Sequence, residues 1–263
     1  ETYYGSGLSA VDEYDFKGNP IQSRTQLLDD PTITDVDWLS MPALNTAIYT
    51  TSNILDALNR PKKTIDPDGN FQEFTYSESG TLKSVKLTDA INLNQKTIVQ
   101  DTRHNAKGQR ESILYGNGTK TSYSYDEKNY RVKRILTVKV SNNDTLQDLN
   151  YYYDPVGNIT TVRDDAQQTI FFANSMIVPK HEYTYDAIYR LIQAKGREKI
   201  GTNNFGTPDN WDDNPWMGEN VPGANNNALQ NYTQNYTYDA SSNMTQLQHI
   251  GSNSGSFTRN LTY

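Results

Sequence analysis

A short motif recurs along the chain and limits what the chain can fold into. Its clearest copy, Tyr183-Thr-Tyr-Asp-Ala-Ile-Tyr-Arg-Leu191, has alternating tyrosines, an aspartate, a turn-forming stretch, an arginine and an aliphatic residue. A second copy, Tyr151-Tyr-Tyr-Asp-Pro-Val-Gly-Asn-Ile159, places its motif tyrosine 32 residues earlier. Weaker copies bring the total to eight, with motif positions between 21 and 53 residues apart. Self-similarity at such intervals is typical of repeat architectures.

Each copy has the outline of a β-hairpin. Two tyrosines separated by one residue point to the same face of a strand. The aspartate at the strand end accepts hydrogen bonds from the following backbone and begins a turn, and Gly157 with Asn158 tolerates the left-handed conformation that a short hairpin loop needs. A structural role in the repeat is therefore predicted for Tyr14, Asp15, Tyr76, Gly80, Gly108, Tyr125, Asp126, Tyr153, Asp154, Gly157, Tyr185, Asp186, Arg190, Tyr238 and Asp239.

The regular pattern predicts one repeat region over residues 1–263. Strands alternate with turns from Ile54 onward, and Asn117-Gly118 is the strongest hairpin signal. Residues 34–51 lack alternation and predict a short helical turn or an insertion loop. Residues 201–230, rich in Asn, Gly and Pro, predict a long loop or insertion between strands ending near Lys195 and resuming at Asn231.

The composition fits a broad sheet better than a thick core. Only 35% of residues are hydrophobic and the mean hydropathy is −0.80, but 19 residues are tyrosine, whose amphipathic rings can cover a sheet without a deep dry interior. The net charge of −7 argues against a nucleic-acid partner. The sequence has no apolar run long enough to span a membrane, no visible signal peptide and no cysteine. The start at Glu1, without a methionine, suggests a fragment of a longer chain.

The sequence offers no set of residues that indicates catalysis. There is neither a cysteine nor a Gly-x-Ser-x-Gly nucleophile motif, and His104, His181 and His249 are widely spaced. Asp66-Pro-Asp-Gly-Asn70 lacks the later glycine and glutamate of a calcium loop and predicts a hairpin turn. We therefore expect no enzyme activity, no metal and no cofactor, although paired carboxylates of a glycoside hydrolase depend on three-dimensional separation.

The aromatic residues allow a second interpretation. Exposed tyrosine and tryptophan rings can stack on sugars, and the best candidates for such a ligand platform are Trp211 and Trp216. Against this, a tyrosine at every motif is better explained by packing between neighbouring hairpins.

At these motifs the chain resembles the RHS/YD-repeat proteins, and most closely the B and C components of bacterial insecticidal toxin complexes. Animal teneurins are more distant members. The resemblance rests on the motif copies, on Gly196-Arg-Glu198, and on His104-Asn-Ala-Lys-Gly-Gln-Arg110 with Tyr115-Gly-Asn-Gly-Thr119, and it covers nearly the whole chain. It implies consecutive β-hairpins in a curved, spiralling sheet that is part of a hollow shell.

The resemblance also implies a function. Such a shell encloses a C-terminal toxic polypeptide until delivery, so this segment would be a wall of a secreted virulence factor, in contact with the rest of the shell, its cargo and other toxin-complex subunits. The core motif and self-cleaving aspartates of the family are not found in this sequence. The alternatives are an extracellular carbohydrate-binding or adhesion module and, third, an enzyme with a deep carboxylate-lined pocket.

Overall fold

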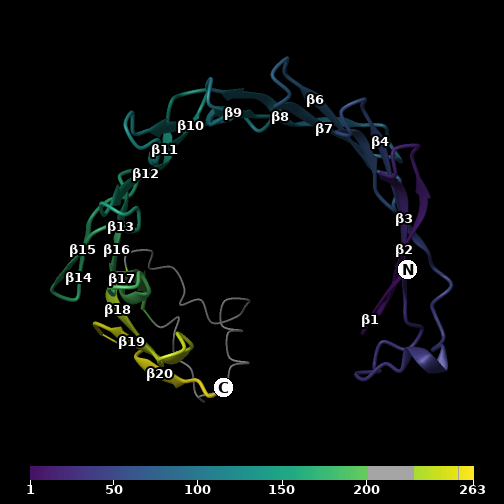
Figure 1. Ribbon diagram of the computed structural model, residues 1–263. Coiled ribbons are helices and arrows are strands. Elements are labelled where there is room, and N and C mark those ends of the chain that lie inside the picture. Colours follow the sequence, from purple (N-terminus) through teal and green to yellow (C-terminus); the bar gives the residue numbers. More distant parts are fainter. Residues whose placement is uncertain (201–227, 254) are drawn as a thin grey trace. The chain divides into compact units, whose positions relative to one another are not determined.

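The computed structural model describes residues 1–200, 228–253 and 255–263. The described chain consists of β-strands joined by turns and loops, with one short 3₁₀ turn at Trp38–Ser40 (Figure 1). The predicted all-β class and the series of consecutive antiparallel hairpins are confirmed. The chain divides into two compact units, Glu1–Lys120 and Thr121–Tyr263.

The first unit is a run of antiparallel strands, each paired with the next along the chain. The 3₁₀ turn lies in the long connection between the third and fourth strands, within the stretch 34–51 for which a short helical turn or a loop was predicted. The last three residues of that stretch, 49–51, belong instead to the fourth strand, because they pair with the third strand. An isolated bridge joins Leu28 to Leu44 in the same connection. The strands are β1 (Thr2–Tyr4), β2 (Gly7–Tyr14), β3 (Pro20–Leu27), β4 (Tyr49–Leu55), β5 (Pro61–Ile65), β6 (Phe71–Tyr76), β7 (Leu82–Thr88), β8 (Gln95–His104) and β9 (Arg110–Tyr115).

The second unit continues the same architecture. Its sheet follows chain order from β11 to β20, except that β14 and β15 form a separate two-stranded hairpin inserted between β13 and β16. The strand β10 (Thr119–Tyr125) begins at the end of the first unit. The others are β11 (Val132–Lys139), β12 (Thr145–Tyr153), β13 (Ile159–Asp164), β14 (Ile170–Phe172), β15 (Ser175–Ile177), β16 (Lys180–Tyr185), β17 (Leu191–Lys199), β18 (Leu229–Tyr238), β19 (Met244–Gly251) and β20 (Phe257–Asn260).

The predicted loop at 201–230 falls mostly outside the described residues, which resume at 228. The strands that flank it are longer than the sequence predicted. β17 continues to Lys199 and β18 begins at Leu229, because these two residues pair with each other and extend the ladder to its end. Because β17 and β18 pair with each other, both strands are longer than the sequence pattern predicted.

The repeated turn is held by its aspartate. In the copy that follows β12, the backbone N–H of Asp154 donates to the carbonyl of Asn158 at 3.0 Å. The Asp154 Oδ1 atom accepts from the N–H groups of Gly157 and Asn158 at 2.7 and 2.8 Å, and Oδ2 accepts from the Asn158 side chain at 2.8 Å. Gly157 has a φ of 115°. The pairing then shifts by one residue, a β-bulge that follows naturally from a left-handed turn residue.

The same carboxylate geometry recurs at Asp239. Its pKa is lowered, first by the hydrogen bond from the side chain of Asn243 and then by that residue's backbone N–H. The left-handed position of this copy is Ser242, with a φ of 70°, and in the preceding copy it is Tyr189, with a φ of 68°. The turn therefore tolerates residues other than glycine, because the aspartate holds the backbone on both sides of the strained position.

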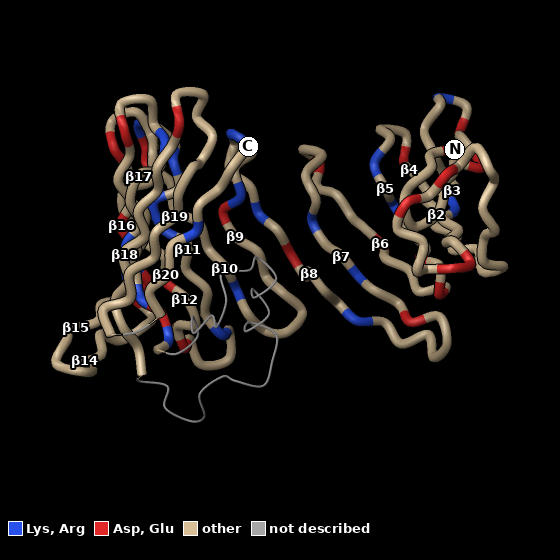
Figure 2. Tube along the Cα trace, turned by 90° about the horizontal axis from the view of Figure 1, so that it is seen from below, with Lys and Arg blue, Asp and Glu red and all other residues tan. Residues whose placement is uncertain are grey.

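The hydrophobic core is thin. The buried apolar side chains among the described residues are Leu8, Ala10, Leu28, Val85, Ile113, Ile177 and Ala194. Acidic and basic residues are interspersed along the strands and turns of each unit (Figure 2). Stability therefore depends on backbone ladders, half-buried tyrosines and polar contacts between neighbouring strands more than on a packed interior.

Candidate functional site: an interlocked turn edge and two unlike sheet faces

Motif tyrosines join successive hairpins at the edge where the repeated turns lie. In each case the hydroxyl donates to the carbonyl of the residue that opens the return strand of the preceding hairpin. The four pairs, donor first, are Tyr76–Pro61 at 2.8 Å, Tyr153–Val132 at 2.7 Å, Tyr185–Ile159 at 2.9 Å and Tyr238–Leu191 at 2.8 Å. The motif tyrosine is therefore a cross-hairpin tie as well as a strand residue.

A basic residue at the end of one turn reaches the next turn. Arg190 binds its own turn through Asp186 Oδ2 at 2.7 Å and donates to the Asp239 carbonyl and the Ser242 hydroxyl of the following turn at 3.3 and 3.2 Å. Its guanidinium carbon lies 4.8 Å from the ring centroid of Tyr238. We call this combination of tyrosine–carbonyl bond and basic residue the turn latch.

The turn latch occurs in both units, with the basic residue bonded to carbonyl oxygens of the following turn. The bonds, donor first, are Arg60–Gly80 at 3.2 Å, Arg131–Asp154 at 3.3 Å and Arg131–Val156 at 2.9 Å. Lys17 donates to the Ala57 carbonyl of the following turn at 2.7 Å, but it stands inside its own turn and the following copy has Leu55 in the tyrosine position, so this contact is only part of a latch. Arg190 is the one basic residue of this set for which the sequence predicted a role in the repeat. A positively charged residue at the close of several motif copies was the signal that could have identified the others.

Within each unit the predicted motif residues lie at the edge formed by the repeated turns, but they do not contribute equally. Tyr14, in the first copy, is 57% exposed, whereas Tyr153 and Tyr185 are half-buried and bonded to the preceding hairpin. Asp126 begins a longer turn, in which the N–H of Asp126 donates to the Arg131 carbonyl. The copies therefore share the same kind of turn but differ in turn length and in the burial of the tyrosine.

Removing one latch hydroxyl tests its contribution. A Tyr238→Phe variant is expected to lose about 1 kcal/mol of unfolding free energy, because the Leu191 carbonyl loses its donor. Tyr152→Phe is the matched control, since Tyr152 is 49% exposed and its hydroxyl makes no hydrogen bond with the described residues. Urea denaturation followed by circular dichroism measures both. Equal losses in the two variants would show that the latch bond contributes nothing.

One face of the second unit is rich in tyrosine. We define the tyrosine face by Tyr151, Tyr183, Tyr232 and Tyr236, which the strand registers place on one side of β12, β16 and β18. All four rings are half-buried, and burial raises the pKa of each hydroxyl. Such a face presents neutral aromatic surface with phenolic hydroxyls.

A buried polar cluster lies on the tyrosine face. His249 is 2% exposed and stacks between Tyr232, at 5.3 Å, and Phe257, at 4.9 Å between ring centroids. Its Nε2 lies 3.1 Å from Glu198 Oε1, which also accepts from the side chain of Gln230 at 2.8 Å. The cluster could not be predicted from the widely spaced histidines of the sequence, because its members are up to 51 residues apart.

The other two histidines have different surroundings. His181 Nδ1 lies 3.5 Å from the hydroxyl of Tyr232, so two histidines distant in sequence contact the same tyrosine. Gly196 makes this possible, because a Cβ at that position would overlap His181 and lie 2.8 Å from the Tyr232 hydroxyl. His104 lies in the first unit, and its buried Nδ1 has no hydrogen bond among the described residues.

His181 makes stability depend on pH. Burial, and secondly the charge of Arg197, hold the pKa of His181 below its ordinary value of 6.5. The unfolded chain therefore binds more protons at acid pH, and the free energy of unfolding should fall as the pH drops below about 6.5. His181→Gln is expected to reduce this slope in urea titrations between about pH 7.5 and about pH 5.5. An unchanged slope would contradict the assignment.

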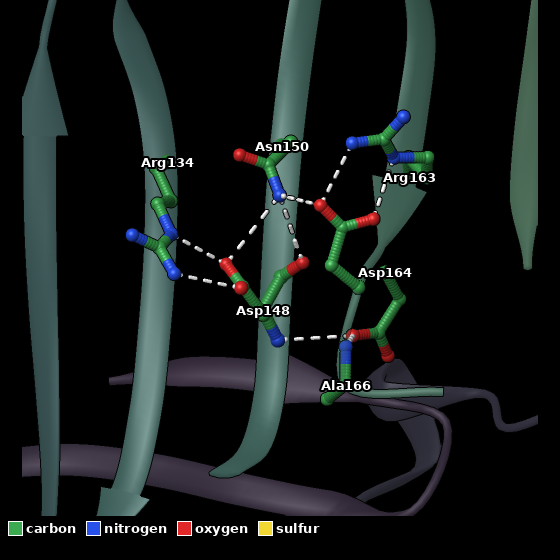
Figure 3. Close-up of polar contacts among 7 residues, drawn as sticks. Arg134, Asp148, Asn150, Arg163, Asp164 and Ala166 are labelled. Atoms are coloured by element: carbon green, nitrogen blue, oxygen red, sulfur yellow. Dashed lines mark hydrogen bonds and ion pairs between the residues drawn. The ribbon is translucent and has the colours of Figure 1, made fainter. Parts of the chain in front are cut away.

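The opposite side of β11, β12 and β13 carries a charged ladder, defined by Arg134, Asp148, Asn150, Arg163 and Asp165 (Figure 3). Arg134 binds Asp148 through two hydrogen bonds of 2.6 and 2.7 Å, and Asn150 donates to both Asp148 and Asp165. The hydrogen bond from Arg134 lowers the pKa of Asp148, which is only 8% exposed. The two faces of this unit thus differ in chemistry, one aromatic and the other ionic.

Trp211 and Trp216, the candidate sugar platform, lie outside the described residues. No group of three or more histidine or acidic residues arranged to hold a metal ion is found in the part of the chain that the structure describes. Within the same residues, no helix is long and apolar enough to cross a membrane. The expectation that the chain is not an enzyme stays a prediction.

Sequence comparison identifies relatives among toxin subunits. No family model matches the chain. Toxin subunit YenC2 of Yersinia entomophaga is 32% identical over 273 residues, and toxin subunit YenC1 of the same organism is 32% identical over 274 residues. Each match covers 99% of this chain and 27% of the relative. The chain therefore spans about a quarter of the length of these curated relatives.

Structural comparison leads to the same group. The crystal structure of TcdB2–TccC3–Cdc42 matches with a TM-score of 0.77 and 32% identity, over 99% of this chain and 12% of that one. The Photorhabdus luminescens Tc holotoxin pore matches with a TM-score of 0.75 and 32% identity, over 98% of this chain and 12% of that one. The chain is therefore homologous, along nearly its whole length, to part of the subunits of Tc toxin complexes, which confirms the resemblance to the toxin-complex branch of the RHS/YD-repeat proteins.

Proposed function

We propose that this chain is a stretch of the wall of a toxin-complex shell, and that its role is to enclose a toxic polypeptide before delivery. The single observation that carries the proposal is the turn latch, repeated in both units of a chain homologous to toxin-complex subunits. A wall must resist local opening, and a sheet edge closed by side-chain bonds between neighbouring turns has that property.

The antiparallel ladder supports the same role. Within each unit, successive strands satisfy one another's backbone groups, so the interior strands offer no free N–H or C=O row to a passing polypeptide. The tyrosine face adds a neutral surface on which an enclosed chain can lie without forming strong ion pairs. The charged ladder supplies polar groups to the opposite side of the sheet at β11, β12 and β13.

The remaining parts of the proposal concern the whole protein. The chain acts as a non-catalytic wall, its partners are the rest of the shell, the enclosed polypeptide and other subunits of the complex, and the assembled protein is secreted. The support for these parts is the naming of its relatives as toxin subunits and the description of one solved relative as a holotoxin pore.

Protease protection tests the proposal. The parent protein that contains this chain should shield an internal polypeptide from added protease, and that polypeptide should be digested rapidly when it is expressed alone. A parent protein carrying Arg190→Met with Tyr238→Phe should leak, because one turn latch is lost, so that digestion becomes several-fold faster. The control Tyr152→Phe should protect as well as the unaltered protein.

Two results would contradict the proposal. One is an internal polypeptide that is cut at the same rate inside the parent protein as when it is free. The other is a parent protein that contains no enclosed polypeptide and instead binds glycans in an array, which would favour the carbohydrate-binding alternative.

A further inference from the structure

A pocket lies on the second unit beside the inserted β14–β15 hairpin. Its volume is about 330 Å³, near the lower limit of small-molecule sites in proteins. The polar part of the lining comes from adjacent strands and includes Lys180, Glu182, Lys195, Asn231 and Thr233. Register places Glu182 opposite Lys195 and Lys195 opposite Thr233, so these groups belong to one face of β16, β17 and β18.

The pocket has more positive than negative charge. Lys180 Nζ lies 2.9 Å from Glu182 Oε1, so this lysine is paired with the one carboxylate among the described lining residues. Lys195 makes no ion pair or hydrogen bond with the described residues through its ammonium group. The described lining residues therefore carry one net positive charge, located on Lys195.

A second cation adjoins the pocket. Arg197 stands two residues after Lys195 on the same face of β17 and opposite the lining residue Asn231. Its guanidinium is bound by the Gln167 side chain and the Gln168 carbonyl, both neutral oxygens. The pKa of Arg197 is lowered by burial, and the charge of Asp164 acts in the opposite direction. Among the described residues, neither of these two neighbouring cations on β17 forms an ion pair with a carboxylate.

The remaining wall is apolar and comes from the inserted hairpin. Met176 and Val178 line the pocket on either side of Ile177, which is completely buried and fixes the hairpin base. The Asn231 amide also donates to the Met176 carbonyl at 3.2 Å. The Met176 side chain is nevertheless 57% exposed and pairs across the hairpin with Phe171, which is 77% exposed. A pocket with an apolar rim and an ammonium group that has no partner among the described residues can bind a ligand that has an apolar part and a negative charge.

We propose that this pocket binds a small organic anion, namely a carboxylate attached to one apolar ring or a short aliphatic body. The carboxylate accepts from Lys195, the amide of Asn231 and the hydroxyl of Thr233 supply neutral hydrogen bonds, and the apolar part contacts Met176 and Val178. This site is separate from the turn latch and goes beyond the enclosing role proposed above.

Benzoate is a suitable probe, with benzamide as the uncharged analogue of the same shape. Titration of the purified protein, followed by saturation-transfer NMR, should show benzoate binding that weakens as salt is added, and benzamide binding at least about tenfold weaker. Lys195→Gln should weaken benzoate binding about tenfold, because the charge-assisted bond is replaced by a neutral one. Lys128→Gln, which changes an exposed turn lysine of the same unit, should leave benzoate binding unaltered.

A second variant keeps the test independent of any change at Lys195. Met176→Glu places a carboxylate at an exposed position on the rim of the pocket, where it can form an ion pair with Lys195 in place of the ligand. This variant should abolish benzoate binding without changing the circular dichroism spectrum. The proposal is overturned by equal binding of benzoate and benzamide, by full binding to Lys195→Gln or Met176→Glu, by an equal loss in Lys128→Gln, or by no detectable benzoate binding to the unaltered protein.

Discussion

A Gly116→Ala variant is expected to lose about 3 kcal/mol of unfolding free energy, at the upper end of the usual cost of overpacking. Gly116 follows β9, and its N–H donates to the Ile98 carbonyl at 3.1 Å. A methyl group at this position would overlap the carbonyl oxygen of Thr97 and lie 2.6 Å from its carbonyl carbon. These are backbone atoms of β8, held by ladders to β7 and β9, so the collision cannot be relieved by rotating a side chain.

Gly5→Ala provides the matched control for this prediction. No heavy atom lies within 4 Å of a Cβ built at Gly5, and its φ is not in the left-handed region. The control is expected to stay within about 0.5 kcal/mol of the unaltered protein. Urea denaturation followed by circular dichroism measures both variants. A Gly116→Ala protein as stable as the Gly5→Ala protein would show that β8 and β9 do not approach as closely as described.

Arg134→Met is expected to cost about 2 kcal/mol of unfolding free energy at neutral pH. Asp148 is the reason, since its side chain is only 11% exposed and receives two hydrogen bonds from Arg134. The variant leaves a buried carboxylate with the weaker amide bond from Asn150 and the longer-range charge of Arg163. This expected loss of unfolding free energy is smaller than the loss for a fully buried ion pair, because the Arg134 side chain is 44% exposed and partly screened by water.

The same prediction has a definite pH dependence. Because Arg134 lowers the pKa of Asp148 below its ordinary value of 3.8, the stabilisation is complete above that pH and is lost as the pH falls through the lowered value. The difference between Arg134→Met and the unaltered protein should therefore shrink in strong acid. It is measured by urea denaturation at neutral pH and below about pH 3.

Arg163→Met is the control within the same charged ladder. Arg163 and Asp165 form an ion pair whose side chains are 45% and 37% exposed, and exposed pairs contribute about 0–1 kcal/mol. Arg163→Met should therefore cost clearly less than Arg134→Met. If the two variants lose the same free energy, burial of Asp148 is not what makes its ion pair stronger.

The sequence by itself determined the all-β class and the position of the repeated turns. These follow from short-range physics, because an aspartate such as Asp154 and the Gly157-Asn158 pair act on backbone groups within four residues. Alternating tyrosines likewise determine which side chains share a face. The resemblance to toxin-complex proteins could be recognised for the same reason, since its motifs are contiguous stretches of sequence.

Only the tertiary structure decided which distant residues meet. Arg190 bonds to the Asp239 carbonyl 49 residues later, and Glu198 lies against His249 51 residues later. No local pattern encodes these contacts, because the pairing of β17 with β18 bridges a long connection whose length does not determine the register. The latch between Arg190 and Tyr238, the buried cluster and the pocket beside Lys195 all depend on that register, since each is built from side chains on neighbouring strands whose alignment is set by the ladder.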